Sequence, residues 1–359
     1  MKKRLCVLLA LCLTLTGCSG LPTAREMGDM ALLRTLGVDA SPEGVAVTGS
    51  TGPRARGVQA EGEAALTLAA DRESLSAACL AMQGQSDSYV FFGYVDQLLV
   101  GEELARDGVR PVLDYFSRDS ELGLGAQFWL VRGTPARDAV SAGGERGVDS
   151  TLETLRHDGE MGIAALTRTA GEVYAGLLEV GAAFAPALSA TGEENAALGE
   201  RGYGILKGDR LAGFLDGEEA CGLELLAGGV RTDVLEVDLP NTRVSVKVNC
   251  AGTRSELVFQ KNSPELLKVN CRVTAELAEY DRPLTARELE LLEETLAVRE
   301  QQRAEAALKQ LRAWQADAAG LGAQAAMVHP VRWEKIREEW PGWFARIPVE
   351  VRVQVKLDR

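Results

Sequence analysis

One cysteine near the N-terminus stands in a sequence context that predicts covalent chemistry. Residues 15–18 are Leu-Thr-Gly-Cys, the form of a lipobox, in which an aliphatic and two small residues precede the cysteine. Only a thiol can form the thioether to a diacylglyceryl group. The basic residues 2–4 and the apolar run at 5–16 precede it, and that run is shorter than the roughly 20 residues of a membrane-spanning helix. We therefore predict that residues 1–17 are a lipoprotein signal peptide and that Cys18 carries the lipid.

Lipidation at this position predicts a membrane-anchored protein. Two acyl chains give stable anchoring, because each buried CH2 group contributes about 0.8 kcal/mol. The chain holds 39 Lys and Arg against 52 Asp and Glu, a formal net charge of -13. An acidic body is repelled by anionic headgroups. The lipid or a partner subunit, rather than basic adhesion, must therefore hold the protein at the membrane.

The remaining cysteines are interpreted as structural. Cys79, Cys221, Cys250 and Cys271 follow the signal peptide and Cys18. Cys250 continues a period-two run of valines, and Cys271 lies between two valines, so both are expected on the apolar side of their strands. We interpret them as buried free thiols that act as small hydrophobic residues. A disulfide between Cys250 and Cys271 is the alternative outside the cytoplasm.

Composition and motifs exclude several classes of function. The acidic balance argues against a nucleic-acid partner, which needs a basic footprint. The chain has two histidines, His157 and His329, so a zinc site of three histidines cannot be assembled. Nucleophile-elbow, Walker, His-Glu-x-x-His and Cys-x-x-Cys motifs do not occur. Residues 320–325 resemble a dinucleotide fingerprint but follow a predicted helix, so we interpret them as a helix C-cap and turn. We predict no catalytic residue, metal or cofactor.

The 359 residues predict two or three domains. After a polar tether at 18–30, we expect an N-terminal α+β domain over 18–195. A C-terminal α+β domain follows over 196–359, with a further division near residue 228 as an option. The first half alternates short strands and helices. The helices are expected at 71–83 with Asp71 as N-cap, at 101–107 and 111–117 separated by Gly108, and near 134–142, 150–157 and 170–180.

The second half is richer in strands. Residues 203–206 and 210–215 flank a hairpin turn at Lys207-Gly208-Asp209. Alternating strands are expected at 230–238, 243–250, 256–260 and 267–279, and again at 349–357. The fold class is thus α+β, with mixed or antiparallel sheets each packed against helices and a terminal strand.

A long helix is expected between these strands. It begins with a capping box of Thr285 and Glu288. Its apolar stripe is interrupted at 299–303, which predicts a helix longer than the sheet it covers. A further helix at 331–340 is expected to end before Pro341.

The ordered set of motifs resembles one family, the Ger(x)C or GerAC-type C-subunit lipoproteins of spore germinant receptors. The resemblance covers nearly the whole chain after the signal peptide. It rests on the lipobox and the following segments: Arg25-Glu26, Leu36-Gly37-Val38-Asp39, Gly101-Glu102-Glu103-Leu104-Ala105-Arg106-Asp107-Gly108, Arg118-Asp119, residues 203–215, Asp317 ahead of Gly320-Leu321-Gly322, Trp333, Trp340 and the closing strand.

The resemblance implies a non-catalytic lipoprotein on the outer face of the spore inner membrane. Its implied partners are an A-type membrane subunit that bears a soluble domain and a transporter-like B-type membrane subunit. Its implied task is to help nutrients trigger germination. Glu103, Arg106, Arg118 and Asp119 are the candidate partner interface. The alternative explanation for them is intramolecular pairing, Arg118 with Asp119 and Glu103 with Arg106.

Two rival functions remain. An extracytoplasmic solute-binding lipoprotein would need two similar α/β lobes around a cleft, and the β-rich second half argues against that symmetry. A cell-wall hydrolase would need a pair of carboxylates held in a cleft.

Overall fold

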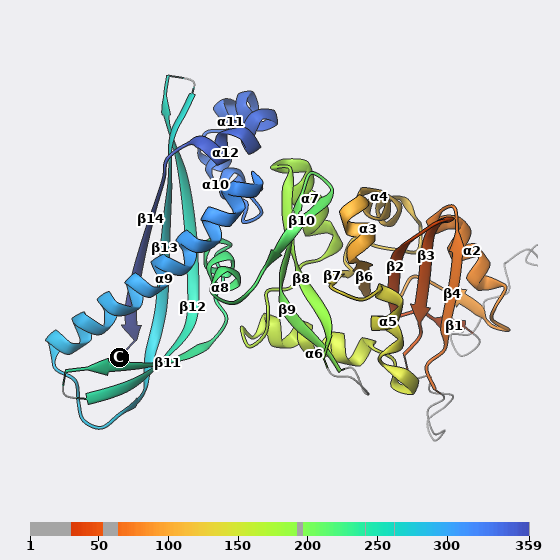
Figure 1. The fold of residues 1–359 in the computed structure, drawn as a ribbon, viewed down its shortest axis with the longest axis horizontal. Helices are drawn as coiled ribbons and strands as arrows, with labels where there is room; N and C mark the ends of the chain where they lie inside the picture. Colours follow the sequence, from red (N-terminus) through yellow and green to blue (C-terminus); the bar gives the residue numbers. More distant parts are fainter. Residues whose placement is uncertain (1–29, 53–63, 192–196, 241, 262, 359) are drawn as a thin grey trace, which may run out of the picture.

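The computed structural model describes residues 30–52, 64–191, 197–240, 242–261 and 263–358. The predicted signal peptide, Cys18 and the Arg25-Glu26 motif lie outside the described residues. Two large sheets, joined through helix α8 (Gly217–Leu226), lie toward opposite ends of the elongated molecule in Figure 1.

The first sheet has eight strands in the order β10-β9-β8-β7-β6-β2-β3-β4. Its four central strands, β8, β7, β6 and β2, are parallel, and the pairs on either side are antiparallel. The strand bounds are β2 (Thr35–Ser41), β3 (Gly44–Ser50), β4 (Thr67–Arg72), β6 (Gln97–Gly101), β7 (Gln127–Val131), β8 (Ala182–Thr191), β9 (Ala197–Lys207) and β10 (Arg210–Leu215). Separately, β1 (Met30–Leu32) and β5 (Tyr89–Phe91) form a two-stranded parallel sheet.

Helices cover both faces of the first sheet. Leu98 and Val100 of β6 join the core on one face, and Leu99 between them joins the core on the other. This alternation is expected of a strand that is buried on both sides. The first face is covered by α2 (Leu75–Gln83), α3 (Glu102–Asp107), α4 (Arg110–Arg118) and α7 (Ala170–Glu179). The second is covered by α5 (Ala136–Ser141) and α6 (Asp149–Glu160).

The second sheet has four strands in the order β11-β12-β13-β14. They are β11 (Asp233–Leu239), β12 (Thr242–Gln260), β13 (Ser263–Tyr280) and β14 (Val349–Asp358). The first three are antiparallel, whereas β14 runs parallel to β13. The long helix α9 (Ala286–Trp314) packs on one face, where Val269, Cys271 and Val273 are buried. Three short helices follow it: α10 (Leu321–Val328), α11 (Pro330–Ile336) and α12 (Trp340–Arg346).

This architecture confirms the predicted α+β class with mixed sheets packed against helices. Several local predictions are confirmed as well. Gly108 ends α3 at φ 144°, and Gly208 supplies the hairpin turn between β9 and β10 at φ 64°. Thr285 and Glu288 form the predicted capping box of α9. The eight-stranded sheet continues through β9 and β10, so it spans the boundary proposed at residues 195/196, and that domain division stays a prediction.

Some local predictions are wrong. Asp71 lies in β4 rather than at a helix start, and Ser74 is the N-cap of α2. Gly320 begins helix α10 instead of ending a helix, since Gln315 is the C-cap of α9. Pro341 lies in the first turn of α12, where a missing N–H is tolerated, rather than terminating a helix.

The thiols are free within the described residues, but they do not all lie in the core. Cys79 and Cys271 are buried, Cys221 is half-buried and Cys250 is exposed. The strand register changes between Val248 and Cys250, so the period-two pattern that predicted a buried Cys250 is broken there.

Candidate functional site

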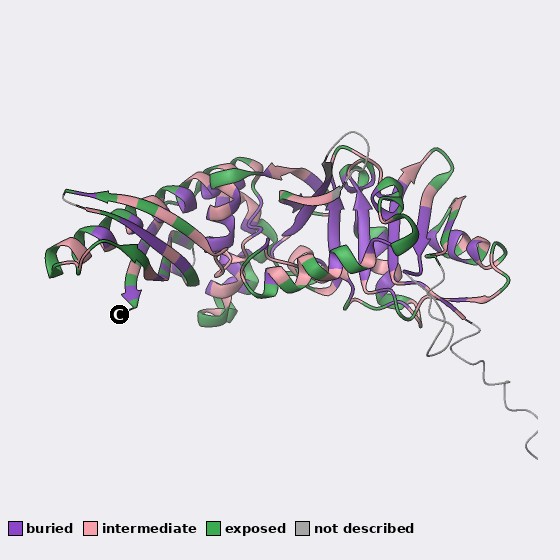
Figure 2. Cartoon of the chain, turned by 90° about the horizontal axis from the view of Figure 1, so that it is seen from below, coloured by how far each residue is buried: buried purple, intermediate pink, exposed green. Residues whose placement is uncertain are grey.

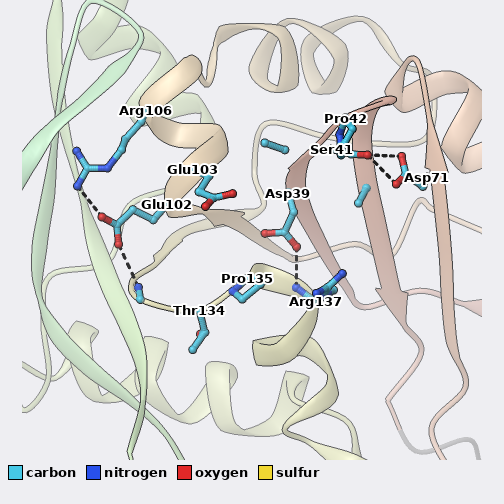
Figure 3. A pocket seen from close by; sticks show the side chains of 13 residues that line it. Asp39, Ser41, Pro42, Asp71, Glu102, Glu103, Arg106, Thr134, Pro135 and Arg137 are labelled. Carbon is cyan, nitrogen blue, oxygen red and sulfur yellow. Dashed lines mark hydrogen bonds and ion pairs between the residues drawn. The ribbon is translucent and has the colours of Figure 1, made fainter.

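A pocket of about 530 Å³ lies at one edge of the eight-stranded sheet (Figure 3). The parallel strands β2, β6 and β7 end there, and the chain leaves β6 and β7 toward opposite faces through α3 and α5. In open α/β sheets such a divergence at the carboxyl ends of strands creates a crevice that commonly binds ligands. The fold therefore marks this pocket as the candidate site.

Asp39 at the end of β2 forms the inner wall of the pocket. Its carboxylate accepts hydrogen bonds from the backbone N–H groups of Ala136 (2.7 Å) and Arg137 (2.9 Å), at the start of α5. The residue is 8% exposed. Burial raises the pKa of Asp39, and the two N–H donors oppose that shift. A Cβ at Gly101 would lie 2.1 Å from an Asp39 oxygen, so glycine is required there.

The helix α3 contributes the charged side of the pocket. Glu102 accepts from Arg106 at 2.6 Å and from the backbone N–H of Gly133 at 3.0 Å, which ties α3 to the loop after β7. Glu103 extends toward the cavity in Figure 3, and it has no hydrogen bond or ion pair to any described residue. The predicted pairing of Glu103 with Arg106 is therefore wrong, because Arg106 pairs with Glu102 one turn away.

On the opposite rim of the pocket, a side-chain hydrogen bond links strands β2 and β4. The Ser41 hydroxyl, at the end of β2, donates to Asp71 of β4 at 2.6–2.7 Å. Carboxylates thus outnumber guanidinium groups around the pocket. Each of these carboxylates except that of Glu103 accepts a hydrogen bond from a neighbouring residue of the pocket wall. The pocket can hold a small polar molecule. In the described part of the chain, no group of three or more His, Cys, Asp and Glu side chains is arranged to hold a metal ion.

Arg118 and Asp119, the other predicted interface residues, lie at the end of α4 and do not line this pocket. Asp119 accepts from the backbone N–H groups of Glu121 (2.9 Å) and Leu122 (3.0 Å). Burial acts to raise the pKa of Asp119, but these donors and the Tyr115 hydroxyl outweigh it and lower the pKa. Arg118 is exposed and forms no ion pair with Asp119, so the predicted pair is absent.

The motif around residue 317 is structural. Asp317 is 1% exposed and accepts from the backbone N–H groups of Leu321 (2.9 Å) and Gly322 (2.6 Å). It also accepts from the indole nitrogen of Trp340 at 2.8 Å. A Cβ at Gly322 would lie 2.5 Å from Trp340 and 2.6 Å from Trp333, so only glycine lets the indoles pack there. The motif thus holds α10, α11 and α12 together.

Two protein-family models match the chain. A model described as "Spore germination protein N-terminal domain" matches residues 23–190, and one described as "Spore germination B3/ GerAC like, C-terminal" matches 201–359. The chain belongs to the Ger(x)C family of spore germination proteins. The Ger(x)C resemblance predicted from the motifs is thereby confirmed.

This Ger(x)C protein is similar to one curated relative in sequence and to one solved structure in fold. The putative spore germination protein YfkR of Bacillus subtilis (strain 168) is 27% identical over 202 residues, which cover 53% of this chain and 51% of YfkR. The match thus spans about half the length of that relative. The crystal structure of the GerBC protein superimposes with a TM-score of 0.56 at 17% identity, covering 90% of this chain and 97% of that one. At that identity the likeness shows a shared fold.

The pocket residues of the Ger(x)C fold were only partly predictable. Glu103 and Arg106 were predicted as site residues. Asp39 and Glu102 were not, although both stand in the motifs that carry the resemblance. The signal that could have found them is their position directly at the ends of apolar runs that become parallel strands.

Proposed function

We propose that this protein is a non-catalytic, lipid-anchored subunit of a spore nutrient germinant receptor. The observation that carries the proposal is the pair of family-model matches, which together cover residues 23–190 and 201–359. The shared fold with GerBC over 90% of the chain supports it. The protein acts in germination by contacting the A-type and B-type membrane subunits on the outer face of the spore inner membrane.

The proposed anchor is a diacylglyceryl group on Cys18. The lipobox is the feature that supports it. Mass spectrometry of the mature N-terminus should find an acylated Cys18. A Cys18→Ala protein should be released from spore membranes, whereas a Cys79→Ala protein should stay with them. An unacylated N-terminus in the wild-type protein would remove the anchor from the proposal.

The receptor role is tested by deleting the gene for this protein in the organism that encodes it and measuring the germination of its spores. Loss of the protein should abolish the response to one nutrient or nutrient mixture and leave nutrient-independent germination intact. Complementation with the wild-type chain should restore the response. A normal response to every nutrient in the deletion strain would contradict the role.

The proposed partner interface includes Glu103 and Arg106 at the pocket and Arg118 and Asp119 at the end of α4. Arg118 is the cleanest probe, because its exposed side chain forms no ion pair among the described residues. Arg118→Ala should weaken co-purification of the A-type and B-type subunits with this protein. Arg287→Ala on α9 is the control, because its side chain is 91% exposed and only a loose ion pair of 3.9 Å joins it to Glu290. Equal recovery of the partners with both variants would exclude Arg118 from the interface.

A further inference from the structure

Strand β14 is a free edge of the second sheet. It is the last strand in the order β11-β12-β13-β14, and its pairing with β13 runs without a register shift to Asp358. Figure 1 shows β14 along the outer flank of this sheet, with α9 crossing one face. A strand at the edge of a sheet presents a row of unpaired N–H and C=O groups, which can pair with a strand of another chain.

Every second residue of β14 directs its backbone groups away from β13. The N–H of Leu267 on β13 donates to the carbonyl oxygen of Pro348 at 3.0 Å. Because alternate residues of a parallel strand bond to the neighbouring strand, the even-numbered residues of β14 face β13 and the odd-numbered ones face outward. The N–H of Leu357 agrees with this assignment, since it donates to Glu293 of α9 at 3.0 Å. The remaining outward groups belong to Val349, Val351, Val353 and Val355.

These valines keep their outward backbone groups open. None of the outward N–H and C=O groups has a hydrogen bond to a described residue. On β4, which ends the first sheet, the edge is protected instead. There the side-chain amide of Gln85 donates to the carbonyl oxygen of Ala69 at 2.6 Å and accepts a hydrogen bond from its N–H at 3.3 Å. Residues 349–358 contain no proline, glycine or bulge that would block an incoming strand, so the edge of β14 can pair.

The side chains of β14 complement a second β14 strand that runs antiparallel to it. The valines join the core under α9, and the polar residues between them face the other side, as the banding of the second sheet in Figure 2 illustrates. If two copies pair around Val353, Glu350 of each copy lies opposite Lys356 of the other, and opposite charges in such positions stabilise the pair. Arg352 then lies opposite Gln354. Within one chain Glu350 pairs with Arg352 at 2.5 Å, whereas Lys356 has no ion pair with any described residue.

The neighbouring registers place like charges together. Pairing around Gln354 sets Arg352 opposite Lys356, and it also sets Glu350 opposite Asp358. Pairing around Arg352 sets that arginine opposite itself. Like charges directly opposite each other destabilise an antiparallel pair. Registers shifted further pair only part of this ten-residue strand. The register around Val353 therefore combines a nearly complete overlap with matched charges.

We propose that β14 docks onto the β14 strand of a second copy of this chain, so that the second sheets of the two copies form one continuous sheet. The interface is isologous: Val353 exchanges backbone hydrogen bonds with Val353 of the other copy, and Val351 does so with Val355. A strand of another protein would meet the same backbone groups, but the charges at 350 and 356 are matched by β14 itself. The inference is independent of the proposed function, because it needs neither the lipid nor a receptor partner.

The test measures self-association of residues 19–359 in reducing buffer by sedimentation equilibrium. The wild type should dimerise with a Kd below about 1 mM. Lys356→Glu sets two carboxylates opposite each other at both ends of the pair and should raise the Kd about tenfold or more. Glu350→Lys/Lys356→Glu restores opposite charges in exchanged positions and should return the Kd to within about threefold of the wild type. Lys309→Glu, an equal charge change at an exposed position on α9, is the control and should stay within about twofold.

Amide hydrogen exchange locates the interface. Exchange at residues 349–357 should slow as the concentration of the wild-type chain rises above the Kd, and unchanged circular dichroism should show that each variant folds. A wild type that stays monomeric at about 1 mM would overturn the proposal. So would equal weakening by Lys356→Glu and Lys309→Glu, or a double variant that associates no better than Lys356→Glu. Slower exchange at 349–357 when another receptor subunit is added to a monomeric chain would replace the second copy by a partner strand.

Discussion

Arg303 and Glu300, one turn apart on α9, form an ion pair of 3.0 Å that is almost completely buried. Arg303 also contacts Glu218 of α8 at 2.6 Å and Asp233 of β11 at 3.3 Å. Burial raises the pKa of Glu300, and Arg303 opposes that shift. The polar turn at 299–303 is therefore the crossing point of α8 and α9. The expectation that it marks a part of the helix beyond the sheet is wrong.

Removal of one partner from this crossing should be costly. Arg303→Met leaves the buried Glu300 with Arg299 alone, at 3.4 Å, and should lower the free energy of unfolding by about 3 kcal/mol. The double variant Glu300→Leu/Arg303→Met removes the stranded carboxylate and should recover more than half of that loss. Urea unfolding followed by circular dichroism measures both. A double variant no more stable than Arg303→Met would show that the carboxylate is not the source of the cost.

The same crossing depends on a glycine. A Cβ at Gly222 of α8 would lie 2.0 Å from the carbonyl oxygen of Arg303 and 2.9 Å from Ala307. Gly222→Ala should therefore force the helices apart and destabilise the protein by about 1–3 kcal/mol. Gly125→Ala is the control, because nothing lies within 4 Å of its added Cβ. Equal unfolding midpoints for the two variants would be inconsistent with this close approach.

The start of α9 should respond to acid. The hydrogen bond from Arg282, together with those from Thr285, lowers the pKa of Glu288 to about 2, from an ordinary 4.5. Because the folded pKa is depressed, the unfolded chain takes up the proton first as the pH falls. The stabilisation by ionised Glu288 is thus complete above pH 4.5 and is lost toward about pH 2.

A Glu288→Gln variant measures this loss. The difference in free energy of unfolding between wild type and Glu288→Gln should be constant near neutral pH and shrink as the pH falls below 4.5. Glu290→Gln, on the same turn and without the capping contacts, should show no such trend. A difference that grows on acidification would contradict the assignment.

Thiol labelling should distinguish the cysteines. Cys250 is exposed, whereas Cys79 and Cys271 are buried, and burial raises the pKa of both, that of Cys79 to about 11. A native chain that starts at Ser19 should show one fast-reacting thiol toward an aromatic disulfide reagent at neutral pH. Cys250→Ser should remove the fast phase, and Cys271→Ser should leave it. A fast phase that survives Cys250→Ser would place the reactive thiol elsewhere.

Signals that act over a few residues were predictable from the sequence. The capping box of Thr285 and Glu288 and the turn at Gly208 depend on neighbours within four positions, so they could be recognised. Cys250 was misplaced because a bulge after Val248 changes which face the strand presents.

Contacts between distant segments were not predictable. Arg303 meets Glu218 across 85 residues of sequence, and Asp39 meets Ala136 across 97. No local pattern encodes these partners, because each depends on how two elements pack in the finished fold. The sequence motif identified Glu103 and Arg106 as candidate residues. It could not predict the pocket that they line, because that pocket forms only when distant segments pack together.

The sheet shared by β8 and β9 also constrains how this protein can change in evolution. One family-model match ends at residue 190 in β8 and the other begins at residue 201 in β9, and these two strands are hydrogen-bonded neighbours. A recombination event that exchanged the second segment for an unrelated one would remove β9 from beside β8 and leave β8 as an open edge of the sheet, which invites aggregation. The two segments are therefore expected to be inherited together and to diversify by point substitution rather than by shuffling.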